Sequence, residues 1–385
     1  MLILFCTSAA LILYVYFGYP LILVSGLLGR RRSPVEAPIV DWPSLSIIVA
    51  ARNEESVIEG KLLNLLAVDY PRDKIEILVG SDGSSDRTEE IVRRFHSQGV
   101  SLLSFPQQIG KSGIQNGLVK FATGSLLVFT DADCFFAPET LRLLVFRFSD
   151  ARVGLVTARP LYENESETPV TQNEGVYLRY ESWIRAEESA RGLLAMASGS
   201  LFSMRRSLWQ PLDPAHGDDF VLPLRVASSG FLNLLEPRAV AVTLLEQKLP
   251  ASMLRLKSRI ISKDFRGLLA NAAILNPFRH GSVAIALWSH KILRWLVPYF
   301  LISLLLSNLF LLAHPVFRAS LFLQLVFYAF ALLGAALRRR SSFLLWSMPF
   351  SFCLVNFAAL VGTLQCLARR PAGQWTPARR HSRAA

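Results

Sequence analysis

The sequence contains little cysteine and little charge. Its four cysteines form neither a metal-knuckle spacing nor a disulfide framework, so neither kind of cross-link is predicted. Only 18% of the 385 residues are charged, while 52% are hydrophobic, which is more apolar than an ordinary soluble domain. A chain of this length can bury a soluble core beside other elements. The apolar excess therefore points to membrane-spanning segments in addition to that core.

Four runs of the sequence contain no charged residue at all: 1–29, 295–317, 319–337 and 341–368. Each is near or above the roughly 20 residues that a helix needs to cross the hydrocarbon core of a bilayer. We predict one transmembrane helix in residues 1–29 and three more in residues 291–368. A transporter would need ionisable residues inside such spans, and these runs offer none.

The first run has no basic segment before it and is too long for a secretory signal, so we favour a membrane anchor. Arg30, Arg31 and Arg32 follow it and should stay on the cytosolic side. This predicts a multi-pass protein of the inner or plasma membrane with residues 33 to about 290 in the cytosol. Residues 338–340 agree with that topology, but four spans leave the basic tail, residues 369–385, outside. Either the last run does not fully cross the membrane, or the tail is an exception to the rule that basic residues stay on the cytosolic side.

The formal net charge of +12 does not indicate nucleic acid, because many basic residues flank the apolar runs. Membrane lipid headgroups and anionic substrates account for such a distribution.

Between the first two spans, the pattern predicts an α/β domain over residues 44–250. Short buried-type runs at 46–50, 75–80 and 125–130 alternate with helical patterns at 54–66, 86–95 and 114–122. This alternation predicts a mostly parallel sheet, with ligands at the carboxyl ends of its strands.

An acidic pair follows the third of these strands. Asp131 and Asp133 are two residues apart, so in an extended segment both carboxylates point to one side. Two such acids repel unless a cation or a proton compensates them, and oxygen ligands suit Mg²⁺ or Mn²⁺ rather than zinc. The alternative is a pair of solvated turn residues.

Polar residues also follow the other strands. Arg52, Asn53 and Glu54 come after the first strand, at a helix start that favours anions. Asp82 ends the second strand before a turn and a helix cap, and we expect it to be free to hydrogen-bond a ligand. Lys111 lies in a glycine-flanked segment that is too short for a phosphate-binding P-loop, so ATP use is not expected.

The motifs at residues 52–54, Asp82, Lys111 and the acidic pair occur together with Ala-Ser-Gly-Ser at 197–200 and His-Gly-Asp-Asp at 216–219. In this order and spacing they resemble family 2 glycosyltransferases over residues 44–270. The resemblance implies a GT-A fold, which binds a nucleotide diphospho-sugar through an acidic pair and a divalent metal. The flanking spans resemble the branch of this family that makes cell-envelope polysaccharides and glycolipids.

The resemblance also implies roles for these residues. Asp219 is the general base, with Asp218 beside it where many relatives have Glu; the alternative is that both acids only start a helix. Asp131 and Asp133 hold Mg²⁺ or Mn²⁺. The other predicted donor-binding residues are Arg52, Asn53, Glu54, Asp82 and Lys111.

Residues 251–290 contain a basic amphipathic pattern in which Arg255 and Arg259 alternate with apolar residues. We predict a helix at the membrane surface that binds lipid headgroups, clasps the leaving diphosphate, or does both. The Q-x-x-R-W motif of processive relatives is absent from this region, which argues against processivity.

The leading hypothesis is an inverting, metal-dependent hexosyltransferase. It would move a sugar from a UDP- or GDP-linked donor to a lipid-linked or glycan acceptor at the cytosolic face. A processive polysaccharide synthase is the alternative. A synthase that also secretes its polymer needs a channel through the membrane, and four spans can form one only if subunits associate as a homo-oligomer. A non-catalytic membrane scaffold is disfavoured because all the key acids are present.

Overall fold

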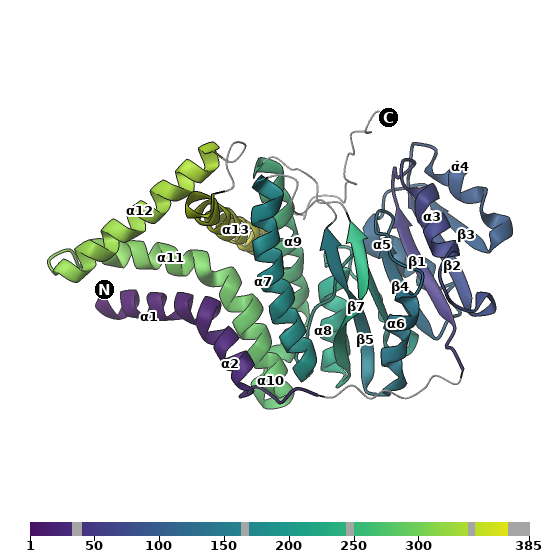
Figure 1. Cartoon of the computed structure of the whole chain (residues 1–385), viewed down its shortest axis with the longest axis horizontal. Coiled ribbons are helices and arrows are strands. Elements are labelled where there is room, and N and C mark those ends of the chain that lie inside the picture. The colour runs from purple at the N-terminus through teal and green to yellow at the C-terminus, as the bar shows by residue number, and fades with distance from the viewer. Residues whose placement is uncertain (33–40, 163–168, 244–249, 338–342, 369–385) are drawn as a thin grey trace.

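The computed structural model describes residues 1–32, 41–162, 169–243, 250–337 and 343–368. The predicted basic tail at 369–385 and the arginines at 338–340 lie outside the described residues. Figure 1 shows two regions, a sheet flanked by helices on the right and a group of long helices on the left.

The sheet has seven strands in the order β3-β2-β1-β4-β6-β5-β7. The strands are β1 (Leu45–Ala51), β2 (Ile75–Asp82), β3 (Val100–Phe105), β4 (Leu126–Asp131), β5 (Val153–Tyr162), β6 (Leu201–Arg205) and β7 (Leu232–Thr243). Only β6 runs antiparallel to its neighbours, β4 and β5. The predicted mostly parallel α/β fold is confirmed.

Strand β1 shows why the sheet is covered on both faces, since all seven of its residues are buried. Ile47 and Val49 point into a core with α3 (Ile58–Leu66), α4 (Thr88–Arg93) and α6 (Thr140–Phe146). Ile48 and Ala50 point the other way, into a core with α5 (Gly110–Val119) and α8 (Asp218–Ser228). This alternation follows from the period of two along a strand.

The strand register gathers the polar strand ends at one edge of the sheet. Ala51 pairs with Ser81 across β1 and β2, and Ala50 pairs with Asp131 across β1 and β4. The segments that begin at Arg52, Asp82 and Asp131 therefore leave the sheet side by side. Ligands of open α/β sheets bind at such an edge.

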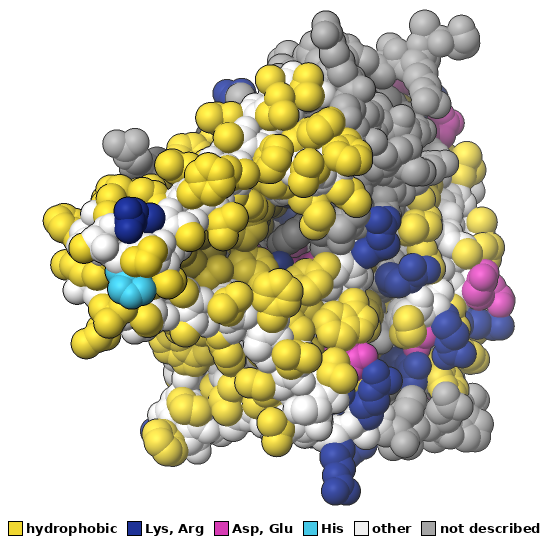
Figure 2. All heavy atoms as spheres, turned by 60° about the vertical axis from the view of Figure 1, so that its left-hand side comes forward, with side chains coloured by type: hydrophobic (Ala, Val, Ile, Leu, Met, Phe, Trp, Pro, Cys, Tyr) yellow, Lys and Arg dark blue, Asp and Glu magenta, His cyan; other side chains and the backbone are white. Residues whose placement is uncertain are grey.

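Four helical segments are long and apolar enough to cross a membrane: Leu2–Ser25, Pro277–Leu309, Pro315–Leu337 and Leu344–Leu367. The first consists of α1 (Leu2–Leu13), a π-turn (Tyr14–Gly18) and α2 (Tyr19–Ser25), and the last two are α12 and α13. Figure 2 shows hydrophobic side chains gathered over this part of the molecule. The predicted number of spans agrees with these segments.

The second helical segment starts earlier in the chain than the uncharged run at 295–317. The helical segment begins at Pro277 and comprises α10 (Pro277–Leu287), a π-turn (Trp288–Ile292) and α11 (Leu293–Leu309). It includes two charged residues that precede the uncharged run, Lys291 and Arg294. Their charges are paired with Glu181, at 3.9 Å and 2.7 Å.

Two long helices, α7 (Pro169–Arg191) and α9 (Pro250–Ala270), lie between the sheet and the spanning helices (Figure 1). Helix α9 packs tightly on both sides. A Cβ at Gly362 of α13 would lie 2.7 Å from the Ser258 carbonyl oxygen, and one at Gly267 would overlap a Val221 methyl group of α8. The basic segment predicted at 251–290 therefore begins as a helix wedged between α8 and α13. Its contact with a membrane surface stays a prediction.

A buried polar cluster joins α7 to the first and second spanning segments. His290 contacts Glu181 through Nε2 at 3.0 Å and Glu188 through Nδ1 at 2.7 Å. Tyr19 donates a hydrogen bond to Glu188 at 2.6 Å, and Arg294 donates one to Glu181 at 2.7 Å. These contacts fix the N-terminal helix and α11 against α7.

Candidate active site

Lys111 lies at the centre of the candidate site, in the first turn of α5. Its Nζ lies 2.8 Å from Asp131 Oδ1, 3.2 Å from Asp218 Oδ2 and 3.4 Å from the Gly199 carbonyl oxygen. The structure thus brings together the end of β4, the start of α5, the start of α8 and the Ala-Ser-Gly-Ser segment. Lys111 contacts the acidic groups of two motifs directly, which sequence spacing did not reveal.

Burial and the lysine have opposite effects on the two carboxyls. Burial raises the pKa of Asp131, and the neighbouring Lys111 lowers it only in part, so the pKa stays above its usual range. Burial also opposes ionisation of Asp218, but Lys111 and a 2.6 Å hydrogen bond from Gln115 Nε2 hold its pKa below the usual range. Burial lowers the pKa of Lys111, but Asp131 and Asp218 reverse that effect and raise it. Lys111 is therefore a permanent cation here.

Asp219 differs from Asp218 in having a free carboxylate. No hydrogen bond or ion pair reaches that carboxylate from any residue that the structure describes. Burial, and then the charge of Asp218, raise the pKa of Asp219 to about 6. Glycines border it closely: a Cβ at Gly199 would lie 3.1 Å from Oδ2, and one at Gly217 3.3 Å from Oδ1. Helix α8 begins at Asp218 with Gly217 as its N-cap, so neither acid caps the helix.

The turn that carries Asp131 and Asp133 is held from beneath by a buried lysine. Lys61 of α3 is fully buried, and its Nζ donates to Thr130 Oγ1 at 2.9 Å and to the Cys134 carbonyl oxygen. Burial lowers the pKa of Lys61 to about 8, although Cys134, Asp131 and Asp133 oppose that shift. The sequence carried a signal for this residue, because Lys61 falls on the apolar face of α3 between Ile58 and Leu62.

Asp131 and Asp133 are carboxylates, the type of ligand that a magnesium-type ion takes. Lys111 already places a positive charge against Asp131. Within the described ranges no group of three or more histidine, cysteine or acidic residues forms a metal cage. Mg²⁺ commonly takes one or two carboxylates and completes its shell with water and substrate phosphates. Two carboxylates at an open strand end are suited to that arrangement, which does not by itself distinguish Mg²⁺ from Mn²⁺.

The expectation that Asp82 is free to bind a ligand was wrong. Its side chain is fully buried and accepts hydrogen bonds from the backbone N–H groups of Ile109, at 2.7 Å, and Gly110, at 3.1 Å. It fixes the turn that leads into Lys111. Gly110 adopts a left-handed conformation there, with φ of 77°. Asp82 is therefore a positioning residue for Lys111 in this structure.

The polar segment after β1 is tied to the turn after β2. Asn53, at a left-handed φ of 51°, accepts from the Ser85 N–H through Oδ1 at 2.8 Å. The backbone N–H of Glu54 donates to Thr88 Oγ1 at 2.8 Å. Arg52 is partly buried beside them. These three predicted donor-binding residues lie at the same sheet edge as Asp131.

On α9, Arg255 is exposed and Arg259 is partly buried. One turn further along, Lys263 lies 3.5 Å from the Pro214 carbonyl oxygen and within electrostatic range of Asp218. The next residue, Asp264, was not expected in the site. Its Oδ1 would lie 2.8 Å from a Cβ at Gly217. Burial, and then the charge of Asp219, raise the pKa of Asp264 well above its usual range.

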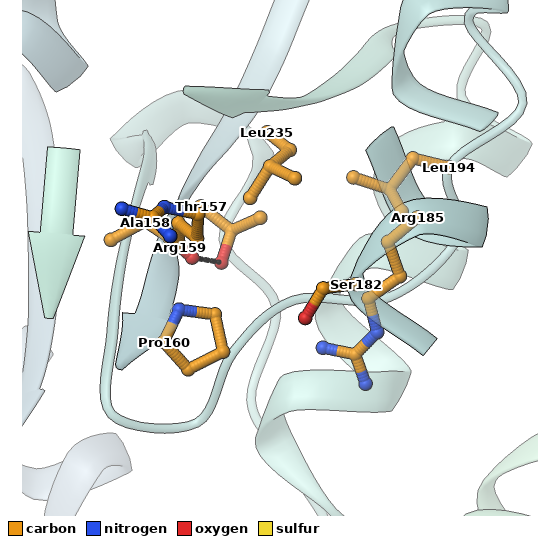
Figure 3. Close-up of a pocket in the computed structure, with 8 residues that line it drawn as sticks. All are labelled: Thr157, Ala158, Arg159, Pro160, Ser182, Arg185, Leu194 and Leu235. Atoms are coloured by element: carbon orange, nitrogen blue, oxygen red, sulfur yellow. Dashed lines mark hydrogen bonds between the residues drawn. The ribbon is translucent and has the colours of Figure 1, made fainter. Parts of the chain in front are cut away.

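A pocket lies between β5, β7 and α7 (Figure 3). Arg185 and Ser182 of α7 face Thr157 and Pro160 of β5, and Leu194 and Leu235 supply apolar walls. Arg185 lies within electrostatic range of Asp219 and Asp264. Thr157 accepts a 2.7 Å hydrogen bond from the Ser198 N–H, which links the pocket to the Ala-Ser-Gly-Ser segment.

Comparisons with known proteins agree with this geometry. The sequence model of the family described as Glycosyl transferase family 2 matches residues 46–211. A beta-monoglucosyldiacylglycerol synthase of Trichormus variabilis is 30% identical over 179 residues, which cover 46% of this chain and 38% of that protein. The probable glycosyltransferase YdaM of Bacillus subtilis is 28% identical over 258 residues, 62% of this chain and 60% of that one. The chain thus spans less than two thirds of the length of either relative.

Among solved structures, a mannosyltransferase from Pyrobaculum calidifontis, PcManGT, was determined in complex with GDP-Man and Mn²⁺. It superposes with a TM-score of 0.73 at 21% sequence identity, covering 95% of this chain and 99% of that one. This likeness shows the fold. The family match in turn shows that residues 46–211 carry a family 2 glycosyltransferase domain, and the fold of the chain is GT-A-like.

Proposed function

We propose that the chain is an inverting, metal-dependent hexosyltransferase. It moves a sugar from a UDP- or GDP-linked donor to a hydroxyl of a glycolipid or glycan at the cytosolic membrane face. The names of the relatives support this acceptor class, since they include a monoglucosyldiacylglycerol synthase and N-acetylglucosaminyltransferases. The GDP-Man and Mn²⁺ complex of the similar structure supports a nucleotide-sugar donor and a divalent ion.

The free carboxylate of Asp219 carries the proposal. Asp218 is held by Lys111 and Gln115, whereas Asp219 is open to a ligand. With a pKa of about 6, Asp219 is mostly ionised at neutral pH yet basic enough to accept a proton. It takes the proton of the acceptor hydroxyl while that oxygen attacks the anomeric carbon from the face opposite the diphosphate. Attack from that face inverts the anomeric centre.

Lys111 and the two strand-end acids serve the leaving group. A permanent ammonium stabilises the negative charge that grows on the departing diphosphate. Asp131 and Asp133 would hold the divalent ion, which supplies Lewis-acid stabilisation of the same charge when bound. Asp82 keeps the turn before Lys111 in place. Arg52, Asn53 and Glu54 lie at the same edge of the sheet, where we propose that the nucleotide-sugar binds. Arg255 and Arg259 on α9 are proposed to meet the diphosphate or lipid headgroups.

A donor panel tests the proposal. The full chain in nanodiscs is supplied with MnCl₂ or MgCl₂ and a set of nucleotide-sugars, and sugar transfer and donor consumption are measured. Asp219→Asn should lower the transfer rate by about 10² to 10⁴-fold, the usual contribution of a general base. Asp213→Asn is the matched control, because Asp213 is an exposed acid just before α8.

If Asp219→Asn keeps near wild-type turnover, Asp219 is not the general base. Consumption of no nucleotide-sugar by the wild-type chain would overturn the enzyme assignment. The size of the product decides between limited addition, which we propose, and processive synthesis, which yields a ladder of long chains.

A further inference from the structure

Lys61 lies on the buried face of α3, where an ammonium group is costly. Its neighbours on that face, Ile58, Leu62 and Leu65, belong to the hydrophobic core. Burial lowers the pKa of Lys61 to about 8, which reflects the free-energy cost of keeping the charge there. A methionine of similar length would fill the same space without that cost. Packing alone therefore does not account for a lysine at this position.

The contacts of Lys61 lie at the two ends of the acidic turn. Its Nζ donates to Thr130 Oγ1, at 2.9 Å, on the residue before Asp131. It also donates to the carbonyl oxygen of Cys134, on the residue after Asp133. Neither partner is a carboxylate. The ammonium thus holds the chain on both sides of the two acids and leaves their carboxylates to other partners.

Asn64, one turn further along α3, holds the chain that follows the acidic turn. Its Nδ2 donates to the Phe136 carbonyl oxygen at 2.8 Å, and its Oδ1 accepts from the Phe136 N–H at 3.3 Å. The Phe136 ring also faces Lys61, whose Nζ lies 4.5 Å from the ring centroid. Within the turn, the Cys134 N–H donates to the Asp131 carbonyl oxygen at 3.2 Å. Helix α3 therefore supports the shape of the turn from outside it.

The same helix is fixed at its start to the polar segment after β1. The Ile58 N–H donates to the Glu54 carbonyl oxygen at 2.9 Å, and the Glu54 N–H donates to Thr88 Oγ1 at 2.8 Å. One helix thus connects the predicted donor-binding residues at 52–54 with the acidic turn. Groups carried by a helix keep their spacing better than groups carried by loops alone.

We propose that Lys61, supported by Asn64, is a positioning residue for the acidic turn. It holds Asp131 and Asp133 in the arrangement in which they would take a divalent ion, so that the turn is ordered before the ion binds. This inference rests on the proposed metal-dependent transfer, although the order of the turn can be measured without metal. Groups that orient metal ligands in this way contribute about 10- to 100-fold to metal affinity.

Lys61 has two effects on a bound cation, and they have opposite signs. Its charge lies within electrostatic range of Asp131 and Asp133, so it opposes the approach of a second cation. Its hydrogen bonds, in contrast, hold the turn that carries both acids. Lys61→Met removes both effects at once. Weaker cation binding in this variant therefore reports the loss of positioning, because the loss of charge alone would strengthen binding.

Hydrogen exchange of the metal-free chain tests the order of the turn. In Lys61→Met, peptides that cover residues 130–137 should exchange about tenfold faster than in the wild type, because hydrogen bonds that limit local opening are lost. Peptides from β1 and α5 should exchange at the wild-type rate, and the Tm should not fall, because methionine relieves the burial of a charge. Faster exchange spread evenly over the sheet, with a lower Tm, would show a merely structural role and overturn the proposal.

Matched variants isolate the hydrogen bond to the turn. Thr130→Val removes the Oγ1 acceptor alone and should speed exchange of the same peptides, whereas Thr130→Ser keeps the hydroxyl and should match the wild type. Lys120→Met, an exposed lysine at the end of α5, is the control for loss of a positive charge. If Lys61→Met does not fold, Thr130→Val decides: exchange at the wild-type rate in residues 130–137 would overturn the proposal.

Mn²⁺ titration tests what the order of the turn does. MnCl₂ is added to the full chain in detergent, and free Mn²⁺ is followed by its electron paramagnetic resonance signal. Lys61→Met should bind Mn²⁺ about 10- to 100-fold more weakly, and half-maximal transfer should need correspondingly more Mn²⁺ while the acceptor KM is unchanged. Equal or tighter Mn²⁺ binding would overturn the positioning role. If the wild type transfers sugar without a divalent ion, the proposed metal dependence fails, and exchange of residues 130–137 still decides whether Lys61 orders the turn.

Discussion

Lys111→Met should make the stability of the catalytic domain depend on a divalent cation. The substitution keeps the length of the side chain but removes the ammonium that lies 2.8 Å from Asp131 and 3.2 Å from Asp218. The two carboxylates then remain close together without a compensating charge. A divalent ion bound at Asp131 and Asp133 would restore the missing positive charge.

The magnitude follows from the burial of the three groups. Removing one partner of a buried ion pair costs roughly 3–5 kcal/mol. The Asp131 side chain is 37% exposed, so solvent screens part of the effect. We therefore expect a loss of about 2–3 kcal/mol, which corresponds to a lower Tm by about 4–12 °C for a domain of this size.

The assay is thermal unfolding of the full chain in detergent, followed by tryptophan fluorescence, with and without MnCl₂. Lys111→Met should gain more from Mn²⁺ than the wild type does, because a ligand that binds only the folded state stabilises it in proportion to its affinity. Lys120→Met, exposed at the other end of α5, is the control. If Lys111→Met melts within about 1 °C of the wild type, or if Mn²⁺ stabilises both equally, the reasoning is refuted.

Two further predictions concern the base and the junction with the spanning helices. Below pH about 6, kcat/KM should fall about tenfold per pH unit, because protonated Asp219 cannot accept a proton. In Asp218→Asn the inflection of the pH profile of kcat/KM should move to lower pH, because the charge of Asp218 helps to raise the pKa of Asp219. An inflection at the wild-type pH would contradict this. Gly362→Leu should cost about 1–3 kcal/mol in thermal unfolding, because its Cβ meets the Ser258 carbonyl oxygen. Leu364→Ala, half exposed on the same helix, should cost less.

The part of the fold that the sequence predicted well is the part governed by local patterns. The runs at 46–50, 75–80 and 125–130 match β1, β2 and β4 to within two residues at each end. They are buried on both faces, so their apolar residues are continuous and easy to recognise. The parallel register then placed Asp131 and the segments after β1 and β2 at one edge, as the alternation of strands and helices implied.

Strands β3, β5, β6 and β7 were not located. Strand β3 lies at the edge of the sheet and is only partly buried, so it has no continuous apolar run. The partners of β5, β6 and β7 are distant in sequence. Strand β6 is inserted antiparallel between β4 and β5, and nothing in its five residues encodes that direction. The hydrogen bonds of Asp82 were not predicted for a similar reason. Its partners, the N–H groups of Ile109 and Gly110, lie 27 and 28 residues away. Contacts of that kind depend on tertiary packing rather than on local sequence.

The charged residues of the second spanning segment show how long-range pairing sets the position of the site. Lys291 and Arg294 face Glu181 of α7, more than one hundred residues earlier. His290 links the same acid to Glu188, which also accepts the hydrogen bond of Tyr19 from the first segment. Partners for such groups are expected wherever a charge lies inside a membrane span.

Helix α7 also carries Arg185, on the turn of helix between Glu181 and Glu188. The contacts that hold the spanning helices therefore also hold one wall of the pocket between β5, β7 and α7. This arrangement fixes the distance between the pocket and the spanning helices. We infer that the buried charges of the second segment position α7, and with it Arg185, relative to the spanning helices, because Arg185, Lys291 and Arg294 all meet Glu181.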